Sequence, residues 1–505
     1  MPSQLDALKA HMSDVLNLGS VSSILHWDQN TYMPPNGSKA RAAQQATIGK
    51  LRHDLFISDR TAKLIEAAAG EVDLGEAESD DAILIRNVRR DFEYESKLPS
   101  DFVAEFANAQ AAGFDVWRKA READDWAAFV PALQRLLDLK LREAELRGYD
   151  EHVYDVFLGS FERGMKTSEV QALFEAEKPA LIELIAEVDR HQDRVDDSVL
   201  HQSFDPEAQR ALSRFAAEAF GVDFGVWANL GEVTHPFCSR IANGDVRITT
   251  RYSPGFFNAG FYATLHETGH GLHGHGFAPE IDGTYLADLE GSSPSVAESQ
   301  SRTWENLVGR SREYWEWMLP HARKFFPEQL AHVDAEGMYR AVNKVRPQFI
   351  RVEADELTYN LHIMLRMEIE MDMVTGALAL KDVPEAWNEK FESYFGITPP
   401  NDAEGCLQDV HWSFGGIGLF IGYALGNMLA VQYYNRALED HPGIPAQIAR
   451  GDFETLHGWL REKIYKHGRK FTADEITRRA TGEGIRVEPH VEYLKNKFAD
   501  VYQLG

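Results

Sequence analysis

Apolar residues recur at spacings of three and four along most of this chain, which is the period of an amphipathic α-helix. In one clear case Val170 and Phe174 share a face, and Thr167 or Ser168 provides the N-cap. Pro179, in the same stretch, is a candidate kink or break. The pattern predicts helices over residues 168–190, 206–220, 294–317, 328–345 and 349–375.

Strand patterns are scarce and cluster in residues 232–252. Two extended runs there flank Asn243-Gly244, and Asn-Gly is a strong signal for a hairpin turn. The apolar run 417–431 is shorter than the ~20 residues of a membrane span and is interrupted by glycines, so it predicts a buried helix. The expected fold is mainly α, one large domain over residues 1–505 with a small β-hairpin.

Composition narrows the classes of protein further. With 44% hydrophobic and 26% charged residues, the chain can bury a large core. The net charge of −27 disfavours nucleic acid and anionic membranes as partners, because both need a basic surface. Two isolated cysteines, Cys238 and Cys406, and no apparent signal peptide predict a cytoplasmic, soluble protein.

The chemistry centres on the pentapeptide His266-Glu267-Thr268-Gly269-His270. Residues four apart share a helix face, so both imidazoles can reach one ion, and zinc readily accepts two such nitrogens. Glu267 lies about 100° round the helix from His266, where it can take a proton from a water molecule at the metal. A chance match is the alternative, but an apolar stretch precedes the motif, and burying these polar groups without a partner is costly.

A catalytic zinc site needs a third protein ligand. The family pattern with a third histidine after the pentapeptide is not met. We expect His273, on the same helix, either to lie beside the metal ligands without binding the metal or to face solvent. An acid on a later helix is therefore the expected third ligand. Spacing favours Glu298 over Glu290 only modestly. The candidates are Glu280, Asp282, Asp288, Glu290 and Glu298.

Several further motifs occur in order along nearly the whole chain. They are the N-terminal segment 26–35 (HWDQNTYMPP), His235-Pro236-Phe237, Asp245-Val246-Arg247-Ile248-Thr249, the HETGH pentapeptide, Ile350-Arg351-Val352-Glu353-Ala354-Asp355 and Gly405-Cys406-Leu407-Gln408-Asp409-Val410-His411-Trp412. In these motifs the sequence resembles the carboxypeptidase Taq family of zinc metallocarboxypeptidases.

The resemblance implies a mostly helical fold with a deep active-site groove, a homodimer, and removal of C-terminal residues from peptides. It implies Glu298 as the third metal ligand, within Ala297-Glu298-Ser299-Gln300-Ser301. Within the single domain we expect an N-terminal helical part, about residues 1–225, and a catalytic part, about 226–505.

Two departures from the family pattern bear on substrate binding and rate. Ala297 stands where the family has histidine, and Leu419-Phe420-Ile421-Gly422-Tyr423 keeps the tyrosine but lacks a tyrosine and a proline.

The remaining roles each have a structural alternative. His411 and Tyr423 are candidate donors to the oxyanion, although His411 could simply pair with Asp409 and Tyr423 could belong to the core.

A substrate carboxylate suits the arginine fork, which makes Arg351, Arg247 and the nearby His235 candidates for binding it. Arg351 could instead bridge to Asp355 on a helix. Gln408, Asp409 and Asp355 are candidate partners of the metal ligands.

The favoured hypothesis is a zinc carboxypeptidase of broad specificity, with Co²⁺ or Mn²⁺ as possible substitutes for Zn²⁺. A zinc endopeptidase or dipeptidyl carboxypeptidase would use the same chemistry. Ala297 and the missing tyrosine also allow a protein that retains zinc but has reduced or lost activity.

Overall fold

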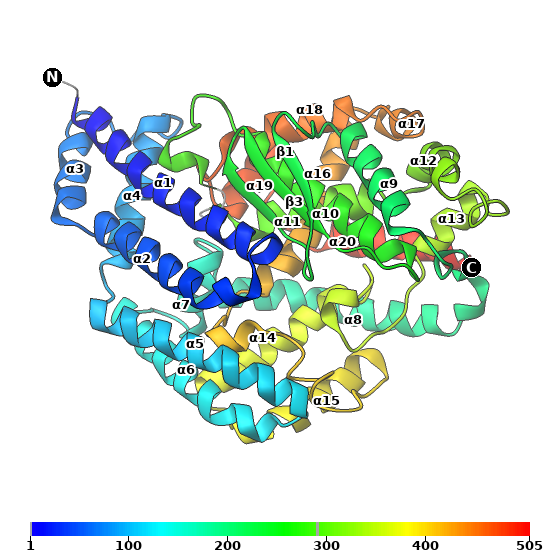
Figure 1. Cartoon of the computed structure of the whole chain (residues 1–505), viewed down its shortest axis with the longest axis horizontal. Helices are drawn as coiled ribbons and strands as arrows, with labels where there is room; N and C mark the ends of the chain where they lie inside the picture. The colour runs from blue at the N-terminus through cyan, green and yellow to red at the C-terminus, as the bar shows by residue number, and fades with distance from the viewer. Residues whose placement is uncertain (1–2, 289–291, 505) are drawn as a thin grey trace.

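The computed structural model describes residues 3–288 and 292–504, and helices make up most of it, which confirms the mainly α fold (Figure 1). The first half contains α1 (Gln4–Thr31), α2 (Ser38–Phe56), α3 (Asp59–Ala69), α4 (Asp80–Glu95), α5 (Ser100–Ala123), α6 (Trp126–Arg147), α7 (Tyr154–Phe161), α8 (Thr167–Asp189) and α9 (Pro206–Ala219). The second half contains α10 (Phe257–His275), α11 (Pro294–Arg302), α12 (Arg312–Phe325), α13 (Ala335–Val342), α14 (Tyr359–Thr375), α15 (Val383–Phe395), α16 (Ile421–Asp440), α17 (Ile444–Ile448), α18 (Glu454–Lys463), α19 (Ala473–Thr481) and α20 (Glu488–Tyr502).

The strands form one small sheet, seen in the upper part of Figure 1. β2 (Cys238–Ala242) and β3 (Asp245–Thr250) pair antiparallel around the Asn243-Gly244 turn, so the expected hairpin is confirmed. A strand absent from the prediction, β1 (Ala228–Glu232), pairs parallel to β3 and makes the order β1-β3-β2. Its sequence, Ala-Asn-Leu-Gly-Glu, has little strand propensity, and pairing in the sheet decides its conformation.

The single helix expected over 294–317 is wrong. The chain forms α11, then the π-helical segment η5 (Thr303–Val308), and α12 begins only after a break. Ser311 caps α12 by accepting a hydrogen bond from the N–H of Tyr314. At the break the backbone of Gly309 passes so close to Leu265 that a Cβ would lie 2.6 Å from it, which explains the glycine.

Two other predicted helices are shorter in the structure. The stretch 328–345 contains only α13, and the stretch 349–375 becomes helical at α14. Before α14, the Asp355 carboxylate accepts hydrogen bonds from the backbone N–H groups of Arg346, Leu357 and Thr358. Such local bonds offer the backbone an alternative to a helix. Pro179, by contrast, is accommodated inside α8.

Helix α16 lies at the centre of the fold and confirms the buried helix expected from its apolar run. Its first half packs into a core with α6, α8 and α14, and its second half packs into another with α9, α10 and α12. Both cores draw on residues from either side of position 225. We therefore propose that residues 1–505 form a single domain. Among the described residues, no helix combines the length and apolar character needed to cross a membrane.

Candidate metal centre

Helices α10 and α11 bring three candidate ligands together. His266 and His270 lie one turn apart on α10, and Glu298 faces them from α11. His266 Nε2 is 3.7 Å from Glu298 Oε1, and His270 Nε2 is 3.5 Å from Glu298 Oε2. Within the described ranges, this is the one group of histidine, cysteine and acidic residues close enough to share a metal ion.

The spacing of these atoms suits a divalent metal. Ligands about 2.1 Å from one tetrahedral zinc ion lie about 3.4 Å apart, close to the two distances observed. Two imidazoles and a carboxylate leave one coordination position open, which is the arrangement of a catalytic site rather than a structural one. The three residues are therefore suited to holding a divalent metal ion.

Packing of α10 and α11 against α16 positions Glu298. A Cβ on Gly426 of α16 would lie 2.6 Å from the Cβ of Glu298, and a Cβ on Gly269 of α10 would lie 2.5 Å from the carbonyl oxygen of Gln300. Only glycine permits these approaches. The glycine inside the HETGH motif thus lets the backbone of α11 approach the histidine-bearing helix closely.

Glu305, which the sequence analysis missed, orients His266. Its Oε2 lies 2.8 Å from His266 Nδ1, which directs Nε2 of the same ring toward Glu298. Arg302 donates to both acids, at 2.9 Å to Glu298 and 3.1 Å to Glu305. Metal-binding histidines usually bond an acid or a carbonyl through the ring nitrogen that does not face the metal, as His266 does with Glu305. Sequence spacing gave no signal, because Glu305 belongs to the π-helical turn η5.

The charges around the three candidate ligands favour ionised acids. Burial raises the pKa of Glu298, but His266 and Arg302 outweigh it and hold that pKa well below its usual range. Burial likewise opposes ionisation of Glu305, and Arg302 with His266 lowers its pKa to about 2. Both side chains are therefore carboxylates at neutral pH, as a metal ligand and a histidine partner must be.

Glu267 differs from these two acids. Its side chain is 6% exposed and forms no ion pair with any residue that the structure describes. Burial raises its pKa to about 7, although His270 acts in the opposite direction. A carboxylate with a pKa near neutrality is suited to taking up and releasing a proton during a reaction. His273, one turn after His270, does not face solvent: it is buried against Tyr465 and Phe277.

A second buried cluster surrounds Asp409. Its carboxylate accepts hydrogen bonds from Arg351, with Nη2 at 2.8 Å, and from Arg366, with Nε at 2.7 Å. These two cations hold the pKa of Asp409 far below its usual range in spite of its burial. Arg351 therefore pairs with Asp409, and the alternative of a bridge to Asp355 is wrong. Asp409 makes no hydrogen bond or ion pair with His266 or His270, and the acid that bonds His266 Nδ1 is Glu305.

Gln408 and Asp355 hold loops together. The side chain of Gln408 accepts from the N–H of Arg351 at 2.7 Å and donates to the carbonyl oxygen of Phe349 at 2.7 Å. Asp355 binds the three backbone N–H groups described above. Neither residue contacts a metal ligand, so the expectation that they orient these ligands needs correction: they position the loop that carries Arg351.

Tyr359 links this loop to the metal centre, and the sequence analysis missed it. Its hydroxyl accepts a hydrogen bond from Arg351 Nη1 at 2.9 Å, and the guanidinium of Arg302 lies 4.5 Å from its ring centroid. Tyr423 packs beside it, with the guanidinium of Arg351 5.2 Å from its own ring. Burial raises the pKa of Tyr423, so its hydroxyl stays protonated and able to donate.

His411 lies next to this cluster in the 3₁₀ turn η8 (His411–Phe414), with Nδ1 3.7 Å from Asp409 Oδ1. That separation is too long for a hydrogen bond. Burial lowers the pKa of His411 to about 4, so the ring is neutral. The ring centroids of His411 and Tyr423 are 6.5 Å apart, and the guanidinium of Arg351 lies 5.2 Å from the Tyr423 ring, so the two oxyanion candidates are neighbours.

The sheet contributes the last candidates. Arg247 donates to Asp245 through Nε and Nη2, both at 2.9 Å, and stacks over the ring of Trp27. Thr249 both accepts from the N–H and donates to the carbonyl of Phe237, which fixes the preceding, exposed His235 to the sheet. Residues of the two motifs, 235–237 and 245–249, are thus joined by hydrogen bonds between Phe237 and Thr249. Glu290, one of the alternative third ligands, lies outside the described residues.

If Glu305 orients His266, replacing it with glutamine should weaken metal binding about 10- to 100-fold. The amide keeps the size of the side chain but loses the negative charge that Arg302 and His266 share. Equilibrium dialysis against a metal chelator measures the change. Glu316→Gln, an exposed position on α12, is the matched control, and equal affinity in both variants would contradict the role.

Two imidazoles, a carboxylate and a buried glutamate on a helical framework define a metal-dependent hydrolase of the HExxH type. Comparison with known proteins makes the family specific. The family model described as carboxypeptidase Taq (M32) metallopeptidase matches residues 7–498.

Relatives match over nearly their full length. Thermostable carboxypeptidase 1 of Thermus thermophilus is 38% identical over 96% of both chains, and carboxypeptidase 1 of Bacillus subtilis is 36% identical over 95% of both. The crystal structure of an M32 carboxypeptidase from Deinococcus radiodurans R1 superposes with a TM-score of 0.95 at 39% identity, covering 99% of this chain and 100% of that one. This chain belongs to the carboxypeptidase Taq (M32) metallopeptidase family. It is a metallocarboxypeptidase, and its family implies a divalent metal ion.

Proposed function

We propose that this carboxypeptidase uses zinc, held by His266, His270 and Glu298, to release single C-terminal residues from peptides with broad specificity. The observation that carries the proposal is the convergence of these three side chains beside the buried Glu267. Zinc suits the two nitrogens and one oxygen better than calcium or magnesium, which prefer oxygen ligands. Co²⁺ and Mn²⁺ are substitutes that the same ligands would accept.

When bound, zinc would supply Lewis-acid chemistry, polarising the scissile carbonyl and making water more acidic. Glu267 takes a proton from the attacking water on its carboxylate and returns it to the departing amine. Its burial, which raises the pKa of the carboxyl to about 7, supports a role as base and then acid. Tyr423 and His411 are the proposed donors to the developing oxyanion.

Recognition of the substrate carboxylate is assigned to arginine. Arg247 and Arg351 each already pair with an acid of the chain, so a substrate would compete with Asp245 or Asp409. The side chain of Arg247 is 21% exposed and that of Arg351 is 6% exposed, which makes Arg247 the more accessible. His235, exposed beside β2, is the proposed third contact. A groove, a homodimer and a cytoplasmic location complete the proposal and rest on family resemblance and composition.

A free C-terminal carboxylate should be required for cleavage. A peptide acid incubated with the zinc-loaded protein is expected to lose residues one at a time from its C-terminus, whereas the C-terminal amide of the same sequence stays intact. Mass spectrometry of both mixtures distinguishes the products. Internal cuts in both peptides would indicate an endopeptidase, and loss of two residues per step a dipeptidyl carboxypeptidase. No cleavage despite bound zinc would mean that Ala297 and Leu419 have cost the activity.

A further inference from the structure

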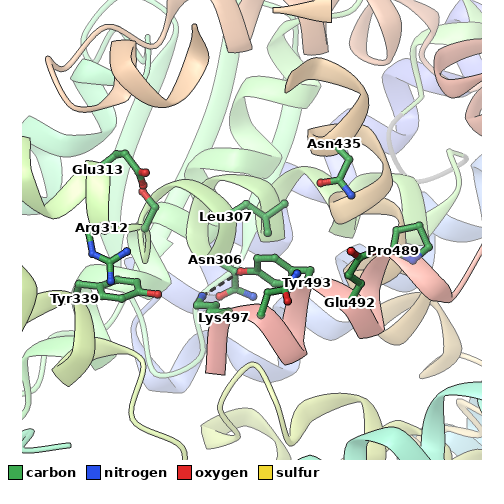
Figure 2. Close-up of a pocket in the computed structure, with 12 residues that line it drawn as sticks. Asn306, Leu307, Arg312, Glu313, Tyr339, Asn435, Pro489, Glu492, Tyr493 and Lys497 are labelled. Atoms are coloured by element: carbon green, nitrogen blue, oxygen red, sulfur yellow. Dashed lines mark hydrogen bonds between the residues drawn. The ribbon is translucent and has the colours of Figure 1, made fainter. Parts of the chain in front are cut away.

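Asn306 and Leu307 of η5 line a cavity of about 410 Å³, and none of the residues that line it is a candidate metal ligand. It lies between η5, the start of α12, α16 and α20, as Figure 2 shows. A volume of this size falls in the range of small-molecule sites, which is about 300–1,000 Å³. No step of the proposed reaction uses this cavity.

Asn306 is an incompletely bonded polar group in the cavity wall. It is 4% exposed, and its Oδ1 accepts a hydrogen bond from Arg310 Nε at 3.2 Å. Its Nδ2 donates no hydrogen bond to any residue that the structure describes. This nitrogen is not among the fully buried polar atoms that lack a partner, so it is open to the cavity and available to an acceptor there.

Lys497 adds a second donor to the cavity. Its Nζ, on a side chain that is 9% exposed, donates to Glu356 at 2.5 Å and to the Tyr493 hydroxyl at 3.0 Å, and Figure 2 draws the latter bond. An ammonium group carries three N–H donors, so one stays available. Asn306 and Lys497 together therefore suit a carboxylate or a carbonyl oxygen.

The cavity wall also carries negative charge. Glu492 and Glu313 line the same cavity, and within the described part of the chain neither forms an ion pair. Figure 2 shows Glu492 beside Pro489 and Asn435, apart from Arg312. A carboxylate without an ion pair and available donors in the same cavity are complementary to a ligand that carries both an ammonium and a carboxylate.

We propose that this cavity binds a free α-amino acid or a very short peptide, with its carboxylate at Asn306 and Lys497 and its ammonium group at Glu492. Such molecules belong to the class that a carboxypeptidase releases, so the cavity is a product-sensing site outside the metal centre. The volume accommodates one or two residues, and the mixed polar wall imposes little choice of side chain.

The cavity is connected to the metal centre through few contacts. Asn306 binds Arg310 at 3.2 Å, Arg310 lies 3.4 Å from Glu305, and Glu305 lies 2.8 Å from His266 Nδ1. Glu305 and Asn306 belong to η5 and Arg310 lies two residues after it, and π-helical turns are frequent at functional sites. A ligand that draws on Asn306 thereby changes the hydrogen bonding of Glu305 and alters turnover. This second step rests on the proposed function of His266.

Binding can be tested without turnover. Calorimetry measures the affinity of the zinc-loaded protein and its variants for L-leucine and L-lysine. N-acetyl-L-leucine amide is the uncharged probe. Glu492→Gln and Asn306→Ala should weaken binding of the free amino acids at the second site at least 10-fold, and Glu488→Gln, an exposed position on the same helix, should not. Since Glu492 is exposed, its variant tests the site even if Asn306→Ala misfolds.

A crystal soaked with L-leucine should show the amino acid between Asn306 and Glu492. Equal affinities in Glu492→Gln and Glu488→Gln, or equal binding of the uncharged probe, would overturn the site.

The effect on turnover has its own readout. Saturating L-leucine should change kcat for a peptide that releases another residue, in Glu488→Gln but not in Glu492→Gln. A change in KM alone would indicate competition at the active site and overturn the coupling. Absence of peptidase activity in every variant would count against the proposed function, while the calorimetric result would still decide the site.

Discussion

Glu267→Gln is expected to lower kcat/KM for peptide hydrolysis by about 10²- to 10⁴-fold, the usual contribution of a general base. The amide is nearly the same size as the buried carboxyl, but it cannot accept a proton from water. Because Glu267 is not one of the three candidate ligands, metal content should remain at one ion per chain. Steady-state kinetics on a peptide acid, together with metal analysis of the same preparation, measure both quantities.

Glu280→Gln is the matched control for this substitution. Glu280 is exposed and follows α10, so its replacement should leave both kcat/KM and metal content unchanged. If Glu267→Gln retained wild-type activity, another group would have to be the base. If it lost the metal as well, the loss of activity would say nothing about proton transfer.

Gly426→Ala is expected to disrupt the metal centre from a position that carries no chemistry. The new methyl group would lie 2.6 Å from Glu298 Cβ and 2.7 Å from its Cγ, well inside van der Waals contact. Overpacking of this kind costs about 1–3 kcal/mol, and here relief requires that α11 move away from α16. Since the displaced side chain is itself a ligand, the loss of metal affinity should exceed the ~10- to 100-fold typical of outer partners.

Chelator competition measures the affinity, and thermal unfolding measures the stability of the same variant. Gly458→Ala is the control, because it lies within α18 with nothing within 4 Å of the added Cβ. Alanine there should keep or slightly raise stability, since it restricts the unfolded chain. Wild-type metal affinity in Gly426→Ala would show that Glu298 does not depend on this contact.

Local patterns predicted much of the fold because their physical causes are local. The period of apolar residues identified α8, α9 and the buried part of α16, and Asn243-Gly244 identified the β2–β3 hairpin. The errors occurred where distant contacts compete with propensity. The helix expected over 294–317 is divided near Gly309, where the backbone lies against Leu265, and Asp355 holds its segment out of a helix before Tyr359.

For the site, the family motifs named residues that the structure does gather, but they did not reveal how these residues act on one another. Arg351 was expected to be a free fork or a partner of Asp355, and instead it pairs with Asp409. Asp409 and Gln408 were expected beside the metal ligands, and Glu305 takes that place. Glu305 belongs to no motif used in the sequence analysis, so only its contact with His266 identifies it.

The sequence by itself determined the pairing of His266 with His270 and the place of Glu267, because helix geometry alone puts residues four apart on one face. Family resemblance pointed to Glu298. Only the tertiary structure decided that Gly269 and Gly426 admit α11 to this centre, that Arg302 and Glu305 orient it, and that Arg351 is neutralised by Asp409. These contacts join helices far apart in the chain, and their distances depend on how the whole core packs.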